Sequence, residues 1–130
     1  MEDSIFTKII KGEIPAHKIY EDEKTLVFLD IYSSQLGHAL VIPKKQVEFL
    51  WDLADEDYEA FMATAKKVAR RQREILPVPY VGVKVIGTDV PHAHVHLIPF
   101  STSEEFARTP KPHAEPDHAA LAAMAEKLKF

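Results

Sequence analysis

The segment Val90–Phe100 carries three histidines on alternate positions: His92, His94 and His96. Successive side chains of a β-strand point to opposite faces, so a strand here would place the three imidazoles on the same face. The residues between the histidines are small or branched and apolar, which suits the opposite face to a core. The spacing therefore predicts a strand over His92–Phe100, with one face for chemistry and one for packing.

Three kinds of role are open to these imidazoles. They could be solvated surface groups, but three of the chain's seven histidines gathered in one short segment make that the least favoured role. They could bind zinc, copper or nickel, and three histidines can supply an open catalytic zinc site. Same-face residues lie roughly 7 Å apart along a strand, however, while zinc–nitrogen bonds are about 2.0–2.1 Å long. Two neighbouring histidines can therefore share one ion, and all three rarely can.

Nucleophilic catalysis by the central histidine, His94, is the third role and the one that the chemistry favours. A neutral imidazole can attack phosphorus, and the covalent product is readily hydrolysed. If one ring nitrogen donates to a backbone carbonyl, the other keeps its lone pair for the substrate. The flanking histidines would then fix the tautomer and handle protons.

The composition is that of one globular domain of 130 residues, with 46% hydrophobic and 28% charged residues. A net charge of −4 and a pI near 6.0 argue against nucleic acid as a partner. The chain has no cysteine, which excludes disulfides and thiolate metal sites. The first residues resemble neither a secretory signal nor a membrane span, so we expect no membrane partner and a cytoplasmic location.

Hydrophobic periodicity and turn residues predict three helices separated by short strands. The clearest helix covers Asp55–Leu76, because acidic residues crowd its first turns, basic residues crowd its later turns, and a proline follows. A short helix is predicted over Ile5–Ile10 with Ser4 as its cap, and an amphipathic helix over Asp117–Lys129. The other predictions are strands over Lys18–Glu21, Thr25–Asp30, His38–Pro43 and Tyr80–Ile86, a turn at Gly87–Asp89, and a loop over Ser101–Pro116.

The histidine segment His92–Leu97 resembles the signature of the histidine-triad (HIT) family of nucleotide hydrolases and transferases. Three further blocks resemble the Hint-like branch of that family in the same order: Ser4–Glu23, Thr25–Ile31 and Gly37–Leu50. The resemblance implies an α+β fold with an antiparallel sheet of about five strands, one long helix and short terminal helices. It also implies a homodimer formed by the long helix and the strand after it, where an exposed sheet edge would invite pairing. We expect a nucleotide-binding domain over residues 1–110 and a C-terminal tail over 111–130 that belongs to the same domain.

The resemblance also implies a role for individual residues. His94 matches the nucleophile that forms a covalent nucleotidyl-histidine, His96 the histidine at the scissile phosphate and leaving group, and His92 and His38 the supporting histidines. Asp30 matches the acid that holds the ribose hydroxyls, which a carboxylate can accept as donors. Without the resemblance, Asp30 would be taken as a turn residue and His38 as a core histidine. The positions that line the base pocket in the family, for which core packing is the alternative, are Phe6, Ile9, Phe28 and Ile31.

The chain departs from the zinc-binding branch of the family. That branch has two cysteines and a histidine where this chain has Ser4, Thr7 and Gln46, and it completes the site with the first histidine of the triad. We therefore expect neither a structural zinc nor any other cofactor.

The segment before the triad is shorter than in the family and offers Gly87, Thr88 and Asp89 toward the phosphate. Thr88 and backbone amides could still donate hydrogen bonds to it. Asp89 facing the phosphate would cost about 4 kcal/mol, for like charges about 4 Å apart at an effective dielectric constant of about 20. Asp89 must therefore point away or cap the turn, or the ligand differs from the family norm.

The sequence thus predicts a nucleotide hydrolase in which His94 attacks the α-phosphorus of a nucleoside phosphoramidate or a related 5′-phosphate ester or anhydride. AMP-like or GMP-like purine nucleotides are the ligands that the resemblance implies. One alternative is a nucleotide-sensing module that binds without turnover. It is suggested by Thr88 and Asp89, which depart from the phosphate-binding segment of the family. The second alternative is a metal protein that uses the histidines of the triad.

Overall fold

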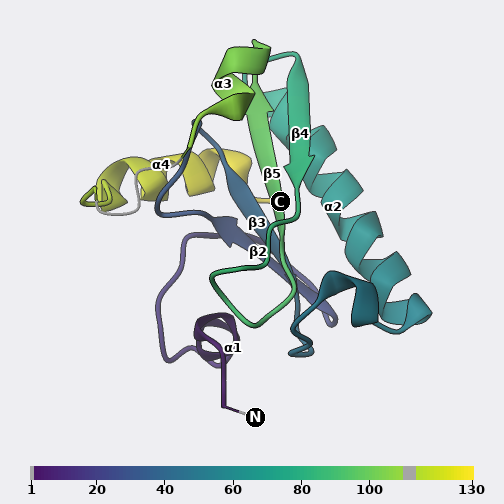
Figure 1. The fold of residues 1–130 in the computed structure, drawn as a ribbon. Coiled ribbons are helices and arrows are strands. Elements are labelled where there is room, and N and C mark those ends of the chain that lie inside the picture. Colours follow the sequence, from purple (N-terminus) through teal and green to yellow (C-terminus); the bar gives the residue numbers. More distant parts are fainter. Residues whose placement is uncertain (1, 110–113) are drawn as a thin grey trace.

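The computed structural model describes residues 2–109 and 114–130, which fold around a five-stranded antiparallel sheet with the strand order β1-β2-β3-β5-β4 (Figure 1). The predicted α+β class, with its five-stranded sheet, long helix and short terminal helices, is confirmed. In chain order the elements are α1 Ile5–Ile10, β1 Lys18–Glu21, β2 Thr25–Leu29, β3 Ala39–Pro43, the 3₁₀ helix η1 Leu50–Asp52, α2 Asp55–Ile75, β4 Tyr80–Lys84, β5 Val95–Phe100, α3 Ser103–Ala107 and α4 His118–Leu128.

The strand register gives the sheet two faces of different use. Phe28, Leu40 and His96 lie directly opposite one another on neighbouring strands, so their side chains share one face, which we call the histidine face. Val41 and Val95 pair in the next row and point to the other face, which we call the helix face because α2 packs on it. The alternation of residue types along the strands therefore places His96 on one face of the sheet and the residues that pack against α2 on the other.

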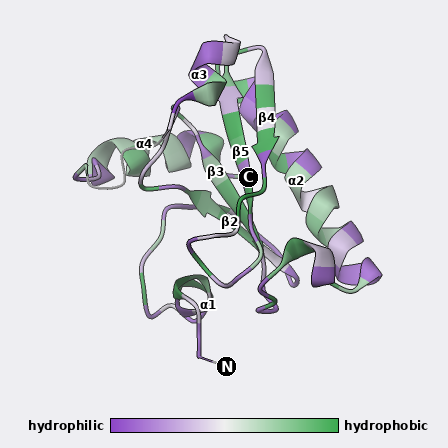
Figure 2. Ribbon diagram, viewed as in Figure 1, coloured by the Kyte–Doolittle hydropathy of each residue, from purple (hydrophilic) through white to green (hydrophobic). Residues whose placement is uncertain are grey.

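The helix face is closed by α2, which begins with three acidic residues and buries one stripe of its surface. The buried residues Phe61, Ala65 and Val68 recur at helical spacing and join the main apolar cluster of the strands. Figure 2 shows hydrophobic residues concentrated on the central strands, and hydrophobic and hydrophilic residues alternating around α2. The helix ends at Ile75, next to the predicted Leu76, because Pro77 follows.

The histidine face is covered in part by α1, whose Phe6 and Ile9 are buried in a second apolar cluster with Phe28 and Leu40. Ser4 caps this helix as predicted, since its side chain accepts a hydrogen bond from the Thr7 amide. The N-terminal segment is thereby brought against the part of the sheet that carries the histidines.

The predicted histidine strand is too long at its start. Strand β5 begins at Val95 rather than His92, because the backbone just before it bonds elsewhere: the Ala93 amide donates to the Val47 carbonyl at 2.7 Å. His92 and His94 therefore precede the strand. Three other strands are one or two residues shorter than predicted: β2 ends at Leu29, β3 begins at Ala39 and β4 ends at Lys84.

The predicted loop over Ser101–Pro116 is wrong in its first part, which contains α3. Thr102 and Glu105 form a capping box, a local signal that outweighs the loop-like composition of the segment. Residues 110–113 of that predicted loop lie outside the described residues. The C-terminal helix α4 is present with Asp117 as its cap, and it buries Leu128 in the main cluster.

Across residues 2–109 and 114–130 we find no helix with the length and apolar character needed to span a membrane.

Candidate active site

Four histidines and one aspartate come from three separate places in the chain. His38 lies directly before β3, His96 lies on β5, and His92 and His94 lie on the segment that leads into β5. Asp30 directly follows β2, whose last residue, Leu29, pairs with Ala39 of β3. The antiparallel pairing of β2, β3 and β5 therefore brings Asp30, His38 and His96 together at the Ala39 end of β3. His92 lies at the other end of β3, beside Pro43, and His94 lies between His92 and His96 in the chain.

The ring of His94 is held so that one nitrogen stays free. Its Nδ1 lies 2.7 Å from the carbonyl oxygen of His92, which can only accept, so Nδ1 carries the proton and Nε2 keeps its lone pair. Phe6 packs edge-on against the ring, with centroids 5.1 Å apart. Among the described residues, Gln72 Oε1 is the single buried side-chain oxygen or nitrogen without a partner. Nε2 of His94 has no hydrogen-bond partner in the described part of the chain either, and it is not among such buried atoms. It therefore touches solvent, although the residue is only 6% exposed.

A chain of hydrogen bonds sets the tautomers of His38 and His96. The Ser34 amide donates to His38 Nδ1 at 3.1 Å, so the proton of a neutral His38 is on Nε2. That Nε2 lies 3.0 Å from His96 Nδ1 and donates to it. The proton of a neutral His96 is consequently on Nε2, where it can be donated to a ligand.

Asp30 lies beside this chain without joining it by a hydrogen bond. Its Oδ2 is 3.6 Å from His38 Nε2 and 3.9 Å from His96 Nδ1. Its Oδ1 accepts from the Tyr32 amide at 2.9 Å, and its backbone carbonyl accepts from the Ser33 hydroxyl. The carboxylate is thus oriented by the following turn, and Oδ2 keeps capacity to accept a hydroxyl donor.

Burial keeps the imidazoles of His38 and His96 neutral at neutral pH. It is the main cause that lowers the pKa of His96 to about 4, and repulsion from His38 and His94 adds to it. Burial also lowers the pKa of His38, against the attraction of Asp30 and with the repulsion of Lys84. The uncharged tautomers of His38 and His96 are therefore the forms present near pH 7.

His92 belongs to a polar cluster formed with α1. Its Nε2 donates to the Pro43 carbonyl at 2.7 Å, and its Nδ1 lies 2.8 Å from Ser4 Oγ and 3.3 Å from Thr7 Oγ1. Thr7 in turn donates to Gln46 Oε1 at 2.6 Å. The residues that stand at the zinc-ligand positions of the resembling branch are therefore brought together, and hydrogen bonds link them.

One group of side chains has metal-like spacing: Asp30, His38 and His96 each offer an atom within 4.8 Å of the others. A tetrahedral ion with bonds of about 2.0–2.1 Å needs ligand atoms about 3.3 Å apart, which these distances approach. The Ser34 amide, however, occupies His38 Nδ1 and keeps the proton on Nε2, the nitrogen that would have to bind the ion. Neutral His38 thus does not fit a metal ligand in this arrangement.

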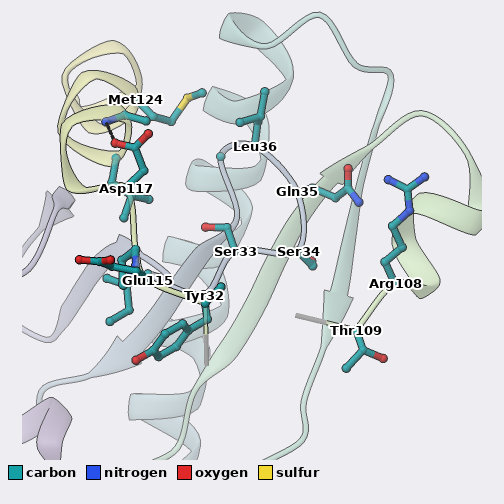
Figure 3. A pocket seen from close by; sticks show the side chains of 16 residues that line it. Tyr32, Ser33, Ser34, Gln35, Leu36, Arg108, Thr109, Glu115, Asp117 and Met124 are labelled. Carbon is teal, nitrogen blue, oxygen red and sulfur yellow. Dashed lines mark hydrogen bonds between the residues drawn. The ribbon is translucent and has the colours of Figure 1, made fainter. Parts of the chain in front are cut away.

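The predicted base-pocket residues fall into two environments. Phe6, Ile9 and Phe28 are buried in the apolar cluster of the histidine face. Ile31 is more exposed and borders a cavity of about 700 Å³ between the loop over residues 31–37 and the C-terminal segment (Figure 3). Figure 3 shows that loop as one wall of the cavity, with Arg108 and Asp117 on different sides. Since Ser34 also lines the cavity, the loop that orients His38 shapes this space as well.

Gly87, Thr88 and Asp89 do not join the histidine cluster by any hydrogen bond of the described chain. Gly87 has φ +77°, which suits the turn, and Thr88 and Asp89 are exposed and bond to each other at 3.4 Å. Two residues near the histidines were missing from the sequence-based prediction: Ser34 and Lys84. Neither stands out locally, because their proximity to His38 and His96 depends on loop conformation and strand register.

The fold and the cluster of histidines define a HIT domain, and a family model of that domain matches residues 11–102. The chain belongs to the HIT family. It is 38% identical over 123 residues to Protein hit of Bacillus subtilis, covering 88% of this chain and 83% of that protein. It is 41% identical over 96 residues to Adenosine 5'-monophosphoramidase HNT1 of Saccharomyces cerevisiae, covering 73% of this chain and 61% of that protein. A crystal structure of a Hit-like protein involved in cell-cycle regulation from Bartonella henselae matches with a TM-score of 0.85 at 28% identity, over 97% of this chain and 93% of that one.

Proposed function

We propose that this chain is a nucleotide hydrolase of the phosphoramidase type that acts through a covalent nucleotidyl-histidine at His94. The observation that carries the proposal is the hydrogen bond from His94 Nδ1 to the His92 carbonyl, which leaves Nε2 bare and in contact with solvent. Membership of the HIT family and the likeness to a protein named as an adenosine 5'-monophosphoramidase support the same chemistry.

In the first step, His94 Nε2 attacks the α-phosphorus of a nucleoside phosphoramidate. The new bond from nitrogen to phosphorus forms as the bond from phosphorus to the leaving amine breaks, and the amine takes up a proton from solvent. His94 becomes a cation whose Nδ1–H faces the His92 carbonyl at 2.7 Å, a charge-assisted hydrogen bond that stabilises it. His96 assists by donating a hydrogen bond from its Nε2–H to the phosphate or the leaving group, and it keeps that proton.

In the second step, water attacks the phosphorus and releases a nucleoside monophosphate. The bond between His94 and phosphorus breaks, its electron pair returns to Nε2, and the proton lost by water passes to solvent. His38 acts as a positioning residue, because its hydrogen bond to His96 Nδ1 keeps the donor of His96 on Nε2. His92 positions His94 through its own carbonyl oxygen.

The nucleoside part of the ligand is assigned by the same reasoning. Asp30 Oδ2 would accept the ribose hydroxyls, and the purine base of an AMP-like or GMP-like nucleotide would lie against the apolar cluster of Phe6, Ile9 and Phe28, with Ile31 at its border. Backbone amides of the turn at Gly87 and Thr88 would face the phosphate, with Asp89 turned toward solvent.

The test is turnover of adenosine phosphoramidate by the wild type, His94→Asn and His118→Asn. We expect His94→Asn to abolish turnover while still binding AMP, and rapid quenching of the wild type to yield a mass increase of one nucleotidyl group. His118→Asn is the matched control, since its imidazole lies at the start of α4, and it should keep full activity. Turnover by His94→Asn would refute the nucleophile, and AMP binding by an inactive wild type would favour the sensing module.

We also propose a homodimer that pairs along β4. This strand is at the end of the sheet, and its residues Tyr80 and Val83 are exposed, with Val83 at 53%. An open edge of this kind is a template for another strand. Light scattering should give twice the chain mass for the wild type and a monomer for Val83→Lys; a wild-type monomer at high concentration would contradict the proposal.

A further inference from the structure

Lys84 starts from the same row of the sheet as His96. The two residues lie directly opposite each other in the pairing of β4 with β5, and directly opposite residues share a face. Lys84 is therefore on the histidine face, and the Cβ atoms of such a pair are about 5 Å apart, which is within reach of a lysine side chain. The sequence alone does not indicate this, because the register of β4 is set by contacts with a distant strand.

The ammonium group of Lys84 is held in place by α3. Its Nζ donates to the Phe106 carbonyl at 2.7 Å and lies 4.5 Å from the centroid of the Phe106 ring. An ammonium has further N–H groups that point elsewhere, so this hold leaves donors for a ligand. The cation is thus partly ordered before any ligand arrives.

The packing of Phe106 against the sheet depends on Gly82. A Cβ built on Gly82 would overlap the Phe106 ring, so only glycine leaves room for that side chain. Gly82 is two residues before Lys84 and therefore on the same face of β4. Figure 1 shows α3 beside β4 and β5. The contacts of Phe106 with Gly82 and Lys84 therefore tie α3 to β4.

Charge supplies the second line of evidence. The charge of Lys84 helps to lower the pKa of both His38 and His96, and the charge of Asp30 opposes that shift. A phosphate that enters this space meets the negative charge of Asp30, so its binding requires a compensating cation. Burial lowers the pKa of His38 and His96, so these two imidazoles are neutral near pH 7 and do not provide one.

We propose that Lys84 binds the non-bridging oxygens of the 5′-phosphate of the nucleotide, as the cation that α3 positions beside His96. This inference rests on the proposed function, since it requires a nucleotide at the histidine face. It makes the site selective for phosphorylated nucleosides over nucleosides, and it gives a short turn at Gly87–Asp89 a partner in holding the phosphate.

The experiment is calorimetric titration of the wild type, Lys84→Met, Lys84→Arg and Lys66→Met with AMP and with adenosine. Met keeps the aliphatic stem against Phe106, and Arg keeps the charge. Lys66 is the matched control, because it is an exposed lysine of α2 on the other side of the sheet. Loss of a hydrogen bond to a charged group predicts that Lys84→Met weakens AMP binding by about tenfold or more, leaving adenosine binding unchanged. Lys84→Arg should recover most of that affinity, and Lys66→Met should match the wild type.

The outcomes separate this inference from the proposed function. If Lys84→Met binds AMP as tightly as the wild type does, Lys84 is not a phosphate ligand, while the proposed function stands. If AMP and adenosine weaken equally, Lys84 acts only on the structure, and the inference is overturned. If the wild type binds neither compound, both the proposed function and the inference fail. A smaller effect of added salt on AMP binding by Lys84→Met than by the wild type would support the inference.

Discussion

The pH dependence of stability should report directly on the burial of His96. In the folded protein the pKa of His96 is lowered to about 4, whereas in the unfolded chain it returns to about 6.5. Below pH 6.5 the unfolded chain therefore binds a proton that the folded protein does not, and acid favours unfolding. The stabilisation due to neutral His96 is complete above pH 6.5 and is lost progressively as the pH falls toward 4.

The size of the effect follows from the same two values. At about 1.4 kcal/mol per pH unit, the interval between a pKa near 6.5 and one of about 4 corresponds to about 3 kcal/mol. Between pH 7 and pH 5, the part that urea denaturation can follow easily, His96 alone should remove about 2 kcal/mol from the free energy of unfolding. His38 and His92, whose pKa values are also lowered by burial, make the total loss of the wild type larger.

The assay compares the wild type and His96→Asn by urea denaturation at pH 8, 7 and 5, at one protein concentration because association would shift the apparent stability. We expect the variant to lose about 2 kcal/mol less than the wild type between pH 7 and pH 5, and both proteins to be insensitive between pH 7 and pH 8. An equal acid-induced loss in the two proteins would show that His96 is not kept neutral by burial. The tautomer chain that runs through His38 would then have no basis.

Two further substitutions test how the site is supported. Gly82→Ala places a Cβ against the ring of the phenylalanine in α3, so it should destabilise the protein by about 1–3 kcal/mol in urea denaturation. An unchanged midpoint would mean that α3 does not rest on the sheet. The triple variant Ser4→Cys, Thr7→Cys and Gln46→His should bind zinc, because it supplies thiolates and an imidazole around His92 Nδ1. The lone pair of Nδ1 now accepts a hydrogen bond from the Ser4 hydroxyl, and replacing Ser4 releases it for the metal. Elemental analysis should find about one zinc per chain in the variant. Absence of zinc from a folded variant would contradict the convergence of these four side chains.

The elements with strong local signals were predicted well. The acidic start, the apolar stripe and Pro77 locate α2 to within one residue, and Asp117 and Ser4 cap the helices that follow them. Strand ends were predicted less well, since a strand ends where its partner ends, and the partner lies far away in the chain. The histidine strand shows this, because the Ala93 amide bonds to Val47 instead of a strand. Helix α3 was missed although Thr102 and Glu105 carry a readable capping box.

The candidate site divides in the same way. Alternate spacing in the chain was sufficient to predict that the residues between the histidines would be buried, as Ala93, Val95 and Leu97 are. The predicted common strand face holds only for His96, because His92 and His94 precede β5. The free nitrogen of His94 is also a local matter, because the carbonyl that orients its ring is only two residues away. The burial pattern and the orientation of His94 depend on residues that are close in sequence, so they need no distant partner.

The remaining features needed the folded chain. His92 is oriented by the carbonyl of Pro43 and the hydroxyl of Ser4, and His96 by His38, all distant in sequence. Lys84 lies beside His96 only because β4 pairs with β5 in one register. Local patterns determine which residue types alternate and where helices begin, but a tautomer or a neighbouring charge depends on groups that meet only when the strands pair.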